Sequence, residues 1–277
     1  MTARLFEGER TIDTIPVGHR GIAYGDGVFE SMRVHDGRVP WWPRHARRLA
    51  DGAARLHLPL PDHEFLEAQV AAMASGREAG VLKLVLSRGG GARGYAPEPD
   101  AVPCWQLSIH PSPQAPATGL QLRWCATRLA IQPLLAGLKH CNRLEQVMAR
   151  EEWRQPGTLH ADADEGLMRD TEGHVVCAVS ANLFVLRDGR WSTPRVDRCG
   201  VAGVCREWAL EALEATQARL TPGDVEVADA VFLCNAVRGI LPVARLGART
   251  WDAHRAVADA RRRLAAAHPA FPWTARS

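Results

Sequence analysis

Short runs of apolar residues separated by turn signals fill much of the first 110 positions. The run at 28–34 suits a strand and is followed by Asp36-Gly37, a pair typical of hairpin turns, so a return strand is expected at 38–41. Two further runs, at 81–87 and 105–109, contain few polar residues and also predict strands.

Between these strands the apolar positions take helical spacing. Pro43 suits the first turn of a helix, where a missing N–H costs little, and it is followed by four apolar positions: Ala46, Leu49, Ala53 and Leu56. A second helix is expected at 62–75 and should end at Gly76. Its buried face is predicted to consist of Phe65, Leu66, Ala68, Val70 and Met73.

The second half of the chain follows a proline-rich connector. Residues 111–119 hold three prolines among small or polar residues, which is typical of a semi-rigid linker. The patterns beyond it predict strands at 120–127, 167–169, 175–179, 183–186 and 231–234, and helices at 142–153, 202–215 and 252–267.

Both halves mix strands and helices without the regular alternation of a doubly wound sheet. This favours an α+β fold. We expect an N-terminal domain at 1–110, a linker at 111–118 and a C-terminal domain at 119–277.

Composition narrows the function. The net charge is only +3, and the densest basic run, Arg261-Arg262-Arg263, is interpreted as a solvated helix face rather than a nucleic-acid site. No apolar stretch approaches the ~18 residues of a membrane span. The seven cysteines form no Cys-x-x-Cys pair and follow no signal peptide, so reduced thiols in a cytoplasm are expected. The chain also lacks the His-x-x-x-His spacing of a zinc enzyme, and no metal is predicted.

Lysine is scarce. It occurs at Lys83 and Lys139, against 32 arginines. An amine can lose its proton and form a Schiff base with a carbonyl, which a guanidinium cannot do. Lys139 is preceded by leucines at 134, 135 and 138, whose apolar surroundings favour the neutral amine. Lys83 lies in a predicted strand and is expected to point to solvent or a salt bridge. The alternative is a biased composition that leaves two surface lysines.

Six strings, in this order along the chain, resemble those of one family. They are Tyr24–Glu30, Arg44–Leu49, Ser87–Tyr95, Ala136–Gln146, Ser180–Phe184 and Cys234–Val243. Together they resemble the fold-type IV enzymes that use pyridoxal 5′-phosphate (PLP), a family of branched-chain and D-amino-acid aminotransferases and aminodeoxychorismate lyases. The lysine string followed by Asn-Arg-Leu-Glu is the most specific of them. The glycine-rich loop and the Asn-Ala-Val-Arg-Gly string are most similar to the lyases.

The resemblance implies PLP as cofactor, held by Lys139 as a Schiff base. The glycines at 200 and 203 precede a predicted helix, and a helix N-terminus with exposed amides binds anions. The residues that the resemblance assigns to the cofactor phosphate are Arg48, Val201, Ala202, Asn235 and Ala236.

One position departs from the family pattern. Five residues before Asn182, relatives have a glutamate that pairs with the pyridine nitrogen, whereas this chain has Cys177, and Glu172 lies in a turn and does not replace it. A thiol titrates near ~8.5, and burial raises this pKa further. The hypothesis is that the pyridine nitrogen is less protonated here, which would weaken transamination more than an elimination that forms an aromatic ring. The alternative is that Cys177 is a buried small residue displaced from the ring.

The resemblance also implies a reaction, from 4-amino-4-deoxychorismate to 4-aminobenzoate and pyruvate, with the same lysine as proton carrier. Arg93 and Tyr95 are expected to bind the two substrate carboxylates, while Phe29 and Ser31 should line the pocket. A homodimer is expected from the family alone. Two alternatives remain: an aminotransferase of D- or branched-chain amino acids, and a PLP-fold protein that binds or regulates without catalysis.

Overall fold

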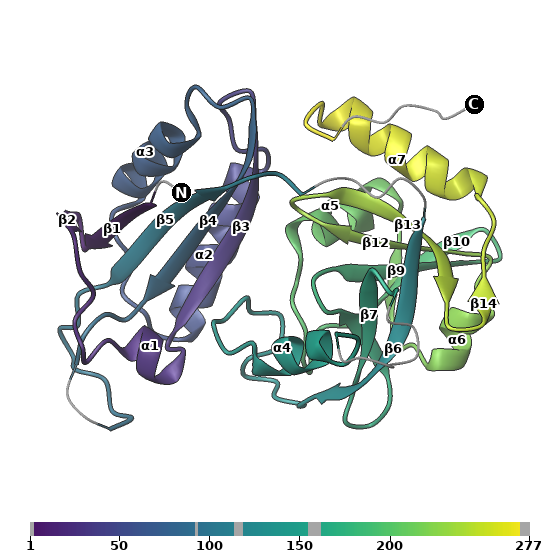
Figure 1. Ribbon diagram of the computed structural model, residues 1–277, viewed down its shortest axis with the longest axis horizontal. Coiled ribbons are helices and arrows are strands. Elements are labelled where there is room, and N and C mark those ends of the chain that lie inside the picture. Colours follow the sequence, from purple (N-terminus) through teal and green to yellow (C-terminus); the bar gives the residue numbers. More distant parts are fainter. Residues whose placement is uncertain (1–2, 92–93, 114–118, 155–161, 272–277) are drawn as a thin grey trace. The chain divides into compact units, whose positions relative to one another are not determined.

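The computed structural model describes residues 3–91, 94–113, 119–154 and 162–271. The chain divides into two compact units (Figure 1). Unit 1 holds residues 1–113 and 138–142, and unit 2 holds residues 114–137 and 143–277.

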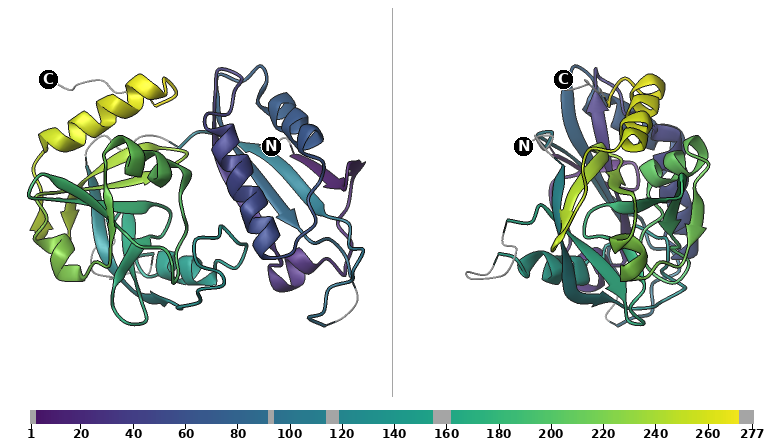
Figure 2. Two further views of the ribbon diagram at one scale, coloured as in Figure 1. Left: turned by 180° about the vertical axis from the view of Figure 1, so that it is seen from behind. Right: turned by 90° about the vertical axis from the view of Figure 1, so that its right-hand side faces the viewer.

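Unit 1 is an antiparallel sheet with helices on one face. Its strands, in the order β2-β1-β5-β4-β3, are β1 (Ala3–Glu7), β2 (Arg10–Ile12), β3 (Gly27–His35), β4 (Ala79–Ser87) and β5 (Cys104–His110). The helices are α1 (Arg20–Tyr24), α2 (Trp42–Arg55) and α3 (His63–Ala74). Figure 2 shows α2 and α3 together against the same face of the sheet. Because β3 is last in the strand order, it is an edge strand of the sheet.

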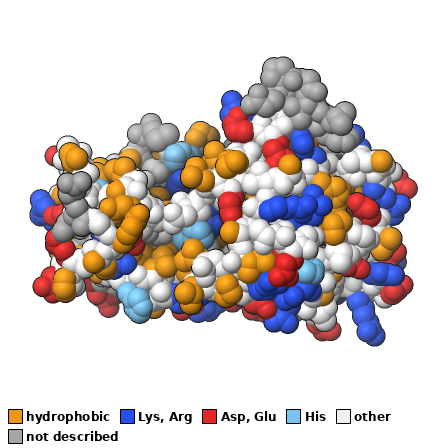
Figure 3. Space-filling view, turned by 90° about the horizontal axis from the view of Figure 1, so that it is seen from below, with side chains coloured by type: hydrophobic (Ala, Val, Ile, Leu, Met, Phe, Trp, Pro, Cys, Tyr) orange, Lys and Arg blue, Asp and Glu red, His pale blue; other side chains and the backbone are white. Residues whose placement is uncertain are grey.

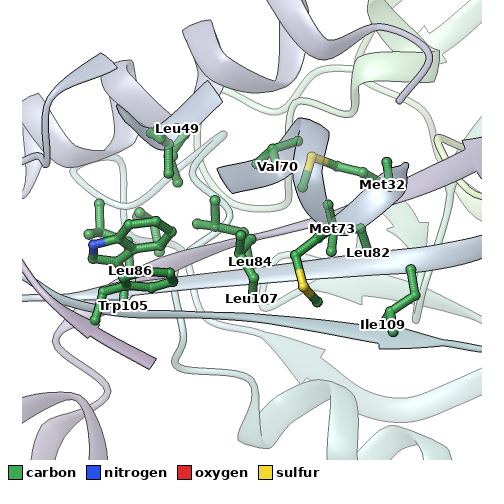
Figure 4. Close-up of a cluster of buried hydrophobic side chains, with 14 of the residues drawn as sticks. Met32, Leu49, Val70, Met73, Leu82, Leu84, Leu86, Trp105, Leu107 and Ile109 are labelled. Atoms are coloured by element: carbon green, nitrogen blue, oxygen red, sulfur yellow. The ribbon is translucent and has the colours of Figure 1, made fainter. Parts of the chain in front are cut away.

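Strand alternation builds the core of unit 1. Along β3, residues 28, 30, 32 and 34 are buried and the residues between them from 29 to 35 are only partly buried, as expected for a strand with one covered face. Leu49 of α2 and Val70 of α3 pack with Leu84 and Trp105 of the sheet (Figure 4).

Unit 2 is built around a mixed sheet. Its described residues form nine strands in the order β11-β10-β9-β12-β13-β6-β7-β8, with β14 beside β13. The strands are β6 (Leu120–Leu129), β7 (Glu165–Asp170), β8 (Val175–Ala178), β9 (Asn182–Arg187), β10 (Arg190–Pro194), β11 (Thr216–Ala218), β12 (Ala230–Asn235), β13 (Gly239–Leu246) and β14 (Arg249–Thr250). The helices are α4 (Leu144–Glu151), α5 (Val204–Ala212), α6 (Pro222–Glu226) and α7 (Arg255–Ala267).

The mixture of helices with antiparallel and mixed sheets confirms the α+β fold class. The return strand expected at 38–41 is wrong: only Arg38 bridges back to His35, and Trp41, with φ of 61°, is the N-cap of α2. The chain leaves unit 1 after residue 113, inside the predicted linker, whose residues 114–118 lie outside the described ranges. Residues 138–142 belong to unit 1, although the sequence prediction placed them in the C-terminal domain.

Among the described residues, no helix is both long and apolar enough to cross a lipid bilayer. On the face drawn in Figure 3, basic and acidic side chains are interspersed.

Candidate active site

Lys139 lies in a short segment that pairs with the edge strand β3. The Phe29 N–H donates to the carbonyl oxygen of Lys139 at 2.9 Å, and the Cys141 N–H donates to the carbonyl oxygen of Gly27 at 2.9 Å. An edge strand presents unpaired backbone groups, which this segment satisfies. The backbone around Lys139 is therefore fixed by strand pairing.

Both lysines of the chain approach the ring of Phe29. The Nζ atom of Lys139 lies 4.3 Å from the ring centroid, and that of Lys83 lies 5.5 Å from it. Ser31 is the cross-strand partner of Lys83, so Phe29, Ser31 and Lys83 share one face of the sheet. Lys83 is exposed as predicted, but no sequence pattern indicated that it lies beside the same ring as Lys139.

Arg48 belongs to a buried charge network in unit 1. Its Nε atom donates to Oε1 of Glu30 at 2.8 Å, and its Nη2 atom donates to Oε2. The Nδ1 atom of His45 lies 2.7 Å from the same Oε2. Sequence analysis identified Arg48 but not the roles of Glu30 and His45.

Electrostatics fix the charges of this network. Burial by itself raises the pKa of Glu30, but the charge of Arg48 and the hydrogen bond from His45 outweigh it and lower the pKa to about 2. Burial lowers the pKa of His45, so the ring is neutral and donates its Nδ1 proton to the carboxylate. The network is thus an ionised carboxylate held by one cation and one neutral donor.

A glycine-rich loop precedes α5 in unit 2. A Cβ atom on Gly203 would lie 2.0 Å from Oδ1 of Asn182, and Gly200 has φ of +87°, so both positions require glycine. The side chain of Asn182 donates to the carbonyl oxygen of Val201 at 2.9 Å. Helix α5 begins with no side-chain cap, and its first amides are suited to an anion.

The backbone amides that sequence analysis assigned to a phosphate differ in whether they already donate a hydrogen bond within the protein. The Ala202 N–H donates to the carbonyl oxygen of Gly137 at 3.0 Å and so takes part in the fold. Within the described ranges, the N–H groups of Val201 and Ala236 have no hydrogen-bond acceptor. Asn182 connects the loop that holds Val201 to strand β12, because its backbone also pairs with Cys234 near the end of that strand.

Asn235 has a structural use that sequence analysis did not foresee. Its Oδ1 atom accepts hydrogen bonds from the N–H groups of Val237 at 3.1 Å and Arg238 at 2.8 Å. Its Nδ2 atom donates to the carbonyl oxygen of Ser180 at 3.3 Å. The side chain therefore stabilises the β12–β13 turn, which contains the backbone amide of Ala236.

Cys177 lies on β8 opposite Met168, with 8% of its surface exposed. Burial raises the pKa of its thiol to about 12, so the thiol is neutral. Glu172 binds Arg198 through both carboxylate oxygens, each at 2.5 Å, and remains in its turn. Neither residue supplies a carboxylate at position 177.

Asp170, Glu172 and His174 come close enough together to face a cation. Both carboxylates are already engaged, because Oδ1 of Asp170 accepts hydrogen bonds from the backbone N–H groups of Glu172 and His174, and Arg198 binds Glu172. This cluster is therefore a salt-bridged turn.

The expected carboxylate-binding residues lie in or beside the glycine-rich loop of unit 1. Arg93 lies outside the described residues, and Tyr95 is 86% exposed. Arg20 anchors the loop: its Nη2 atom donates to the carbonyl oxygen of Tyr95 at 2.9 Å, and its Nε atom donates to Asp26 at 2.8 Å. Arg88 shares Asp26 and also donates to backbone carbonyls, which is a structural role.

Comparisons with known proteins agree on one family. The model of the amino-transferase class IV family matches residues 27–246. An aminodeoxychorismate lyase from Vibrio harveyi is 37% identical over 244 residues, which cover 84% of this chain and 88% of that protein. The crystal structure of 4-amino-4-deoxychorismate lyase from Pseudomonas aeruginosa is similar with a TM-score of 0.86 and 40% identity, covering 95% of this chain and 98% of that one. The T.th. branched-chain amino acid aminotransferase with pyridoxamine 5′-phosphate has the same fold, with a TM-score of 0.81 and 21% identity over 97% of this chain and 95% of that one.

The buried carboxylate of Glu30 makes stability depend on pH. Its pKa falls from 4.5 to about 2 on folding. The stabilisation is therefore fully present above pH 4.5 and is lost as the pH falls toward 2. A shift of this size corresponds to about 3 kcal/mol. In urea unfolding experiments between about pH 5 and pH 3, we expect the free energy of unfolding to fall more steeply for the wild type than for Glu30→Gln.

His45 makes a second contribution to the pH dependence of the free energy of unfolding in the wild type. Burial lowers its pKa, so stability is also lost as the pH falls below 6.5. Glu67→Gln, at an exposed position of α3, is the matched control and should keep the wild-type slope. Equal slopes for Glu30→Gln and the wild type below pH 4.5 would contradict the assignment of an ionised Glu30.

Proposed function

The chain belongs to the amino-transferase class IV family, and from this premise we propose that it is a PLP-dependent lyase that converts 4-amino-4-deoxychorismate into 4-aminobenzoate and pyruvate. The observation that carries the proposal is the placement of Lys139. Its backbone is paired with β3, and its amine lies 4.3 Å from the ring centroid of Phe29.

The residues present fit a phosphorylated aldehyde cofactor. PLP supplies an aldehyde carbon and an electron-withdrawing ring. Lys139 would hold the aldehyde, and Arg48 would bind the phosphate. In unit 2, the amides of Val201 and Ala236, which have no acceptor within the described ranges, are suited to donate to a phosphate. The loop keeps glycine at position 203 because a Cβ there would clash with the side chain of Asn182.

Lys139 is suited to carry the proton. Its Nζ atom would take the proton from the amine-bearing carbon of the substrate. The C–O bond to the enolpyruvyl group would then break, the ring would become aromatic, and the leaving group would take up a proton as pyruvate. Phe29 would exclude water on one side of the amine.

Lys83 is a candidate for binding a substrate carboxylate, a role that sequence analysis did not assign to it. Its ammonium group is exposed beside Phe29, on the face of the sheet that also holds Ser31. A substrate with two carboxylates needs such donors. We assign one carboxylate to Lys83 and Ser31 and keep Arg93 and Tyr95 for the other.

The neutral thiol of Cys177 favours elimination over amino transfer. A thiol with a pKa near 12 cannot stabilise a protonated pyridine nitrogen as a carboxylate does. The formation of an aromatic product supplies a driving force that amino transfer lacks. We further propose that the protein works as a homodimer in the cytoplasm. The family resemblance supports the dimer, and the seven free cysteines support a reducing compartment.

Replacing Lys139 tests the proposed function directly. We expect Lys139→Ala to lower pyruvate release from 4-amino-4-deoxychorismate by about 10³-fold or more, because the proton carrier is lost. The release is followed with a pyruvate-consuming coupled assay. Lys83→Ala is the matched control: it should keep turnover within about 10-fold while raising KM by about 10-fold through the lost carboxylate contact. Wild-type activity in Lys139→Ala would end the proposal.

Replacing Cys177 tests the choice between elimination and amino transfer. Cys177→Glu places an anion where relatives have one, and we expect it to increase amino transfer from an amino acid to an oxo acid by about 10-fold or more. Cys177→Gln has the same size without the charge and should show no increase. If Cys177→Glu folds and binds the cofactor but gains no amino transfer, the role given to the thiol is wrong.

A further inference from the structure

Glu30 places an ionised carboxylate on the core side of β3. Its neighbours on that face, Val28 and Met32, are buried and apolar. Only 2% of the Glu30 side chain is accessible. An apolar residue would satisfy the packing there, and a buried ion pair is often no more stabilising than an apolar replacement. Stability alone therefore gives weak grounds for a carboxylate at this position.

His45 gives a second indication that the network is not arranged for stability. Its ring is fully buried, and among the described residues its Nε2 atom has no hydrogen-bond partner. A buried polar atom without a partner is costly and calls for an explanation other than stability. His45 and Arg48 lie three residues apart on α2, so one helical turn holds both donors against the carboxylate of Glu30.

The contact with Glu30 fixes the orientation of Arg48. The carboxylate binds the Nε–Nη2 edge of the guanidinium, and such a bidentate pair sets both the plane and the direction of the group. The Nη1 side is consequently directed away from Glu30. The accessible part of the pair belongs to Arg48, whose side chain is 15% accessible.

We propose that Glu30 is a positioning residue that presets the guanidinium of Arg48 for the phosphate of the cofactor. His45 holds the carboxylate in the orientation that matches the guanidinium. This inference rests on the proposed function, because it requires a phosphorylated cofactor. It goes beyond that function by naming the residue that organises the phosphate site without touching the phosphate.

Pyridoxal, which is PLP without its phosphate, separates positioning from general structural support. The full-length chain is depleted of cofactor and titrated with PLP and with pyridoxal, and binding is followed by the absorbance of the bound aldehyde. We expect Glu30→Gln to weaken PLP binding by about 10-fold to 100-fold and to leave pyridoxal binding within about twofold of the wild type. Arg48→Lys, which keeps the charge but loses the fork, should show the same selective loss. Glu67→Gln, the exposed control, should bind both compounds as the wild type does.

The double variant tests whether Glu30 acts through Arg48. Because both changes disrupt one unit, Glu30→Gln combined with Arg48→Lys should lose no more PLP affinity than Arg48→Lys alone. The inference is overturned if Glu30→Gln weakens PLP and pyridoxal equally, if it leaves PLP binding unchanged, or if the two losses add.

If Glu30→Gln does not fold, Glu30→Asp provides the same test, since it keeps the charge but its side chain is one methylene shorter and does not reach the guanidinium of Arg48. Unaltered PLP binding by Glu30→Asp would then overturn the inference. Failure of the wild type to bind PLP at all would instead overturn the proposed function, so the two failures are distinguishable.

Discussion

The open edge of β3 is the constraint on which the proposed active site depends. Residues 139–141 pair with this edge: the carbonyl oxygen of Lys139 accepts a hydrogen bond from the Phe29 N–H, and the Cys141 N–H donates to the carbonyl oxygen of Gly27. A catalytic group on a paired strand is held more rigidly than one on a loop. Gly137, two residues before the lysine, is hydrogen-bonded to the loop at 200–202.

The two faces of β3 serve different purposes. Phe29 and Ser31 lie on the face where the lysine amines gather, whereas Glu30 lies between them in sequence and points into the core. Because successive residues of a strand alternate between its faces, this short stretch of one strand contacts both the lysine amines and Arg48, the arginine that we propose binds the phosphate. In unit 2, Cys177 leaves the proposed pyridine contact uncharged.

The sequence was sufficient for features that depend on local patterns. Strand and helix periodicity predicted most elements and the α+β class, and the order of the six strings predicted the family. Contacts between elements far apart in the sequence could not be predicted from these patterns. The position of Lys83 beside Phe29 follows from the register between β3 and β4, and the pairing of Arg48 with Glu30 comes from a contact between α2 and β3 that no sequence spacing predicts. The strand expected at 38–41 failed because Trp41 adopts a left-handed conformation and starts the helix.

The chain contains only two lysines, which makes the covalent site unusually easy to map. The holoenzyme is treated with borohydride, which reduces an imine to a stable secondary amine, and its peptides are identified by mass spectrometry. The phosphopyridoxyl group should be found on Lys139, with loss of the imine absorbance, and Lys83 should remain unmodified. Label on Lys83 or on neither lysine would contradict the central assignment.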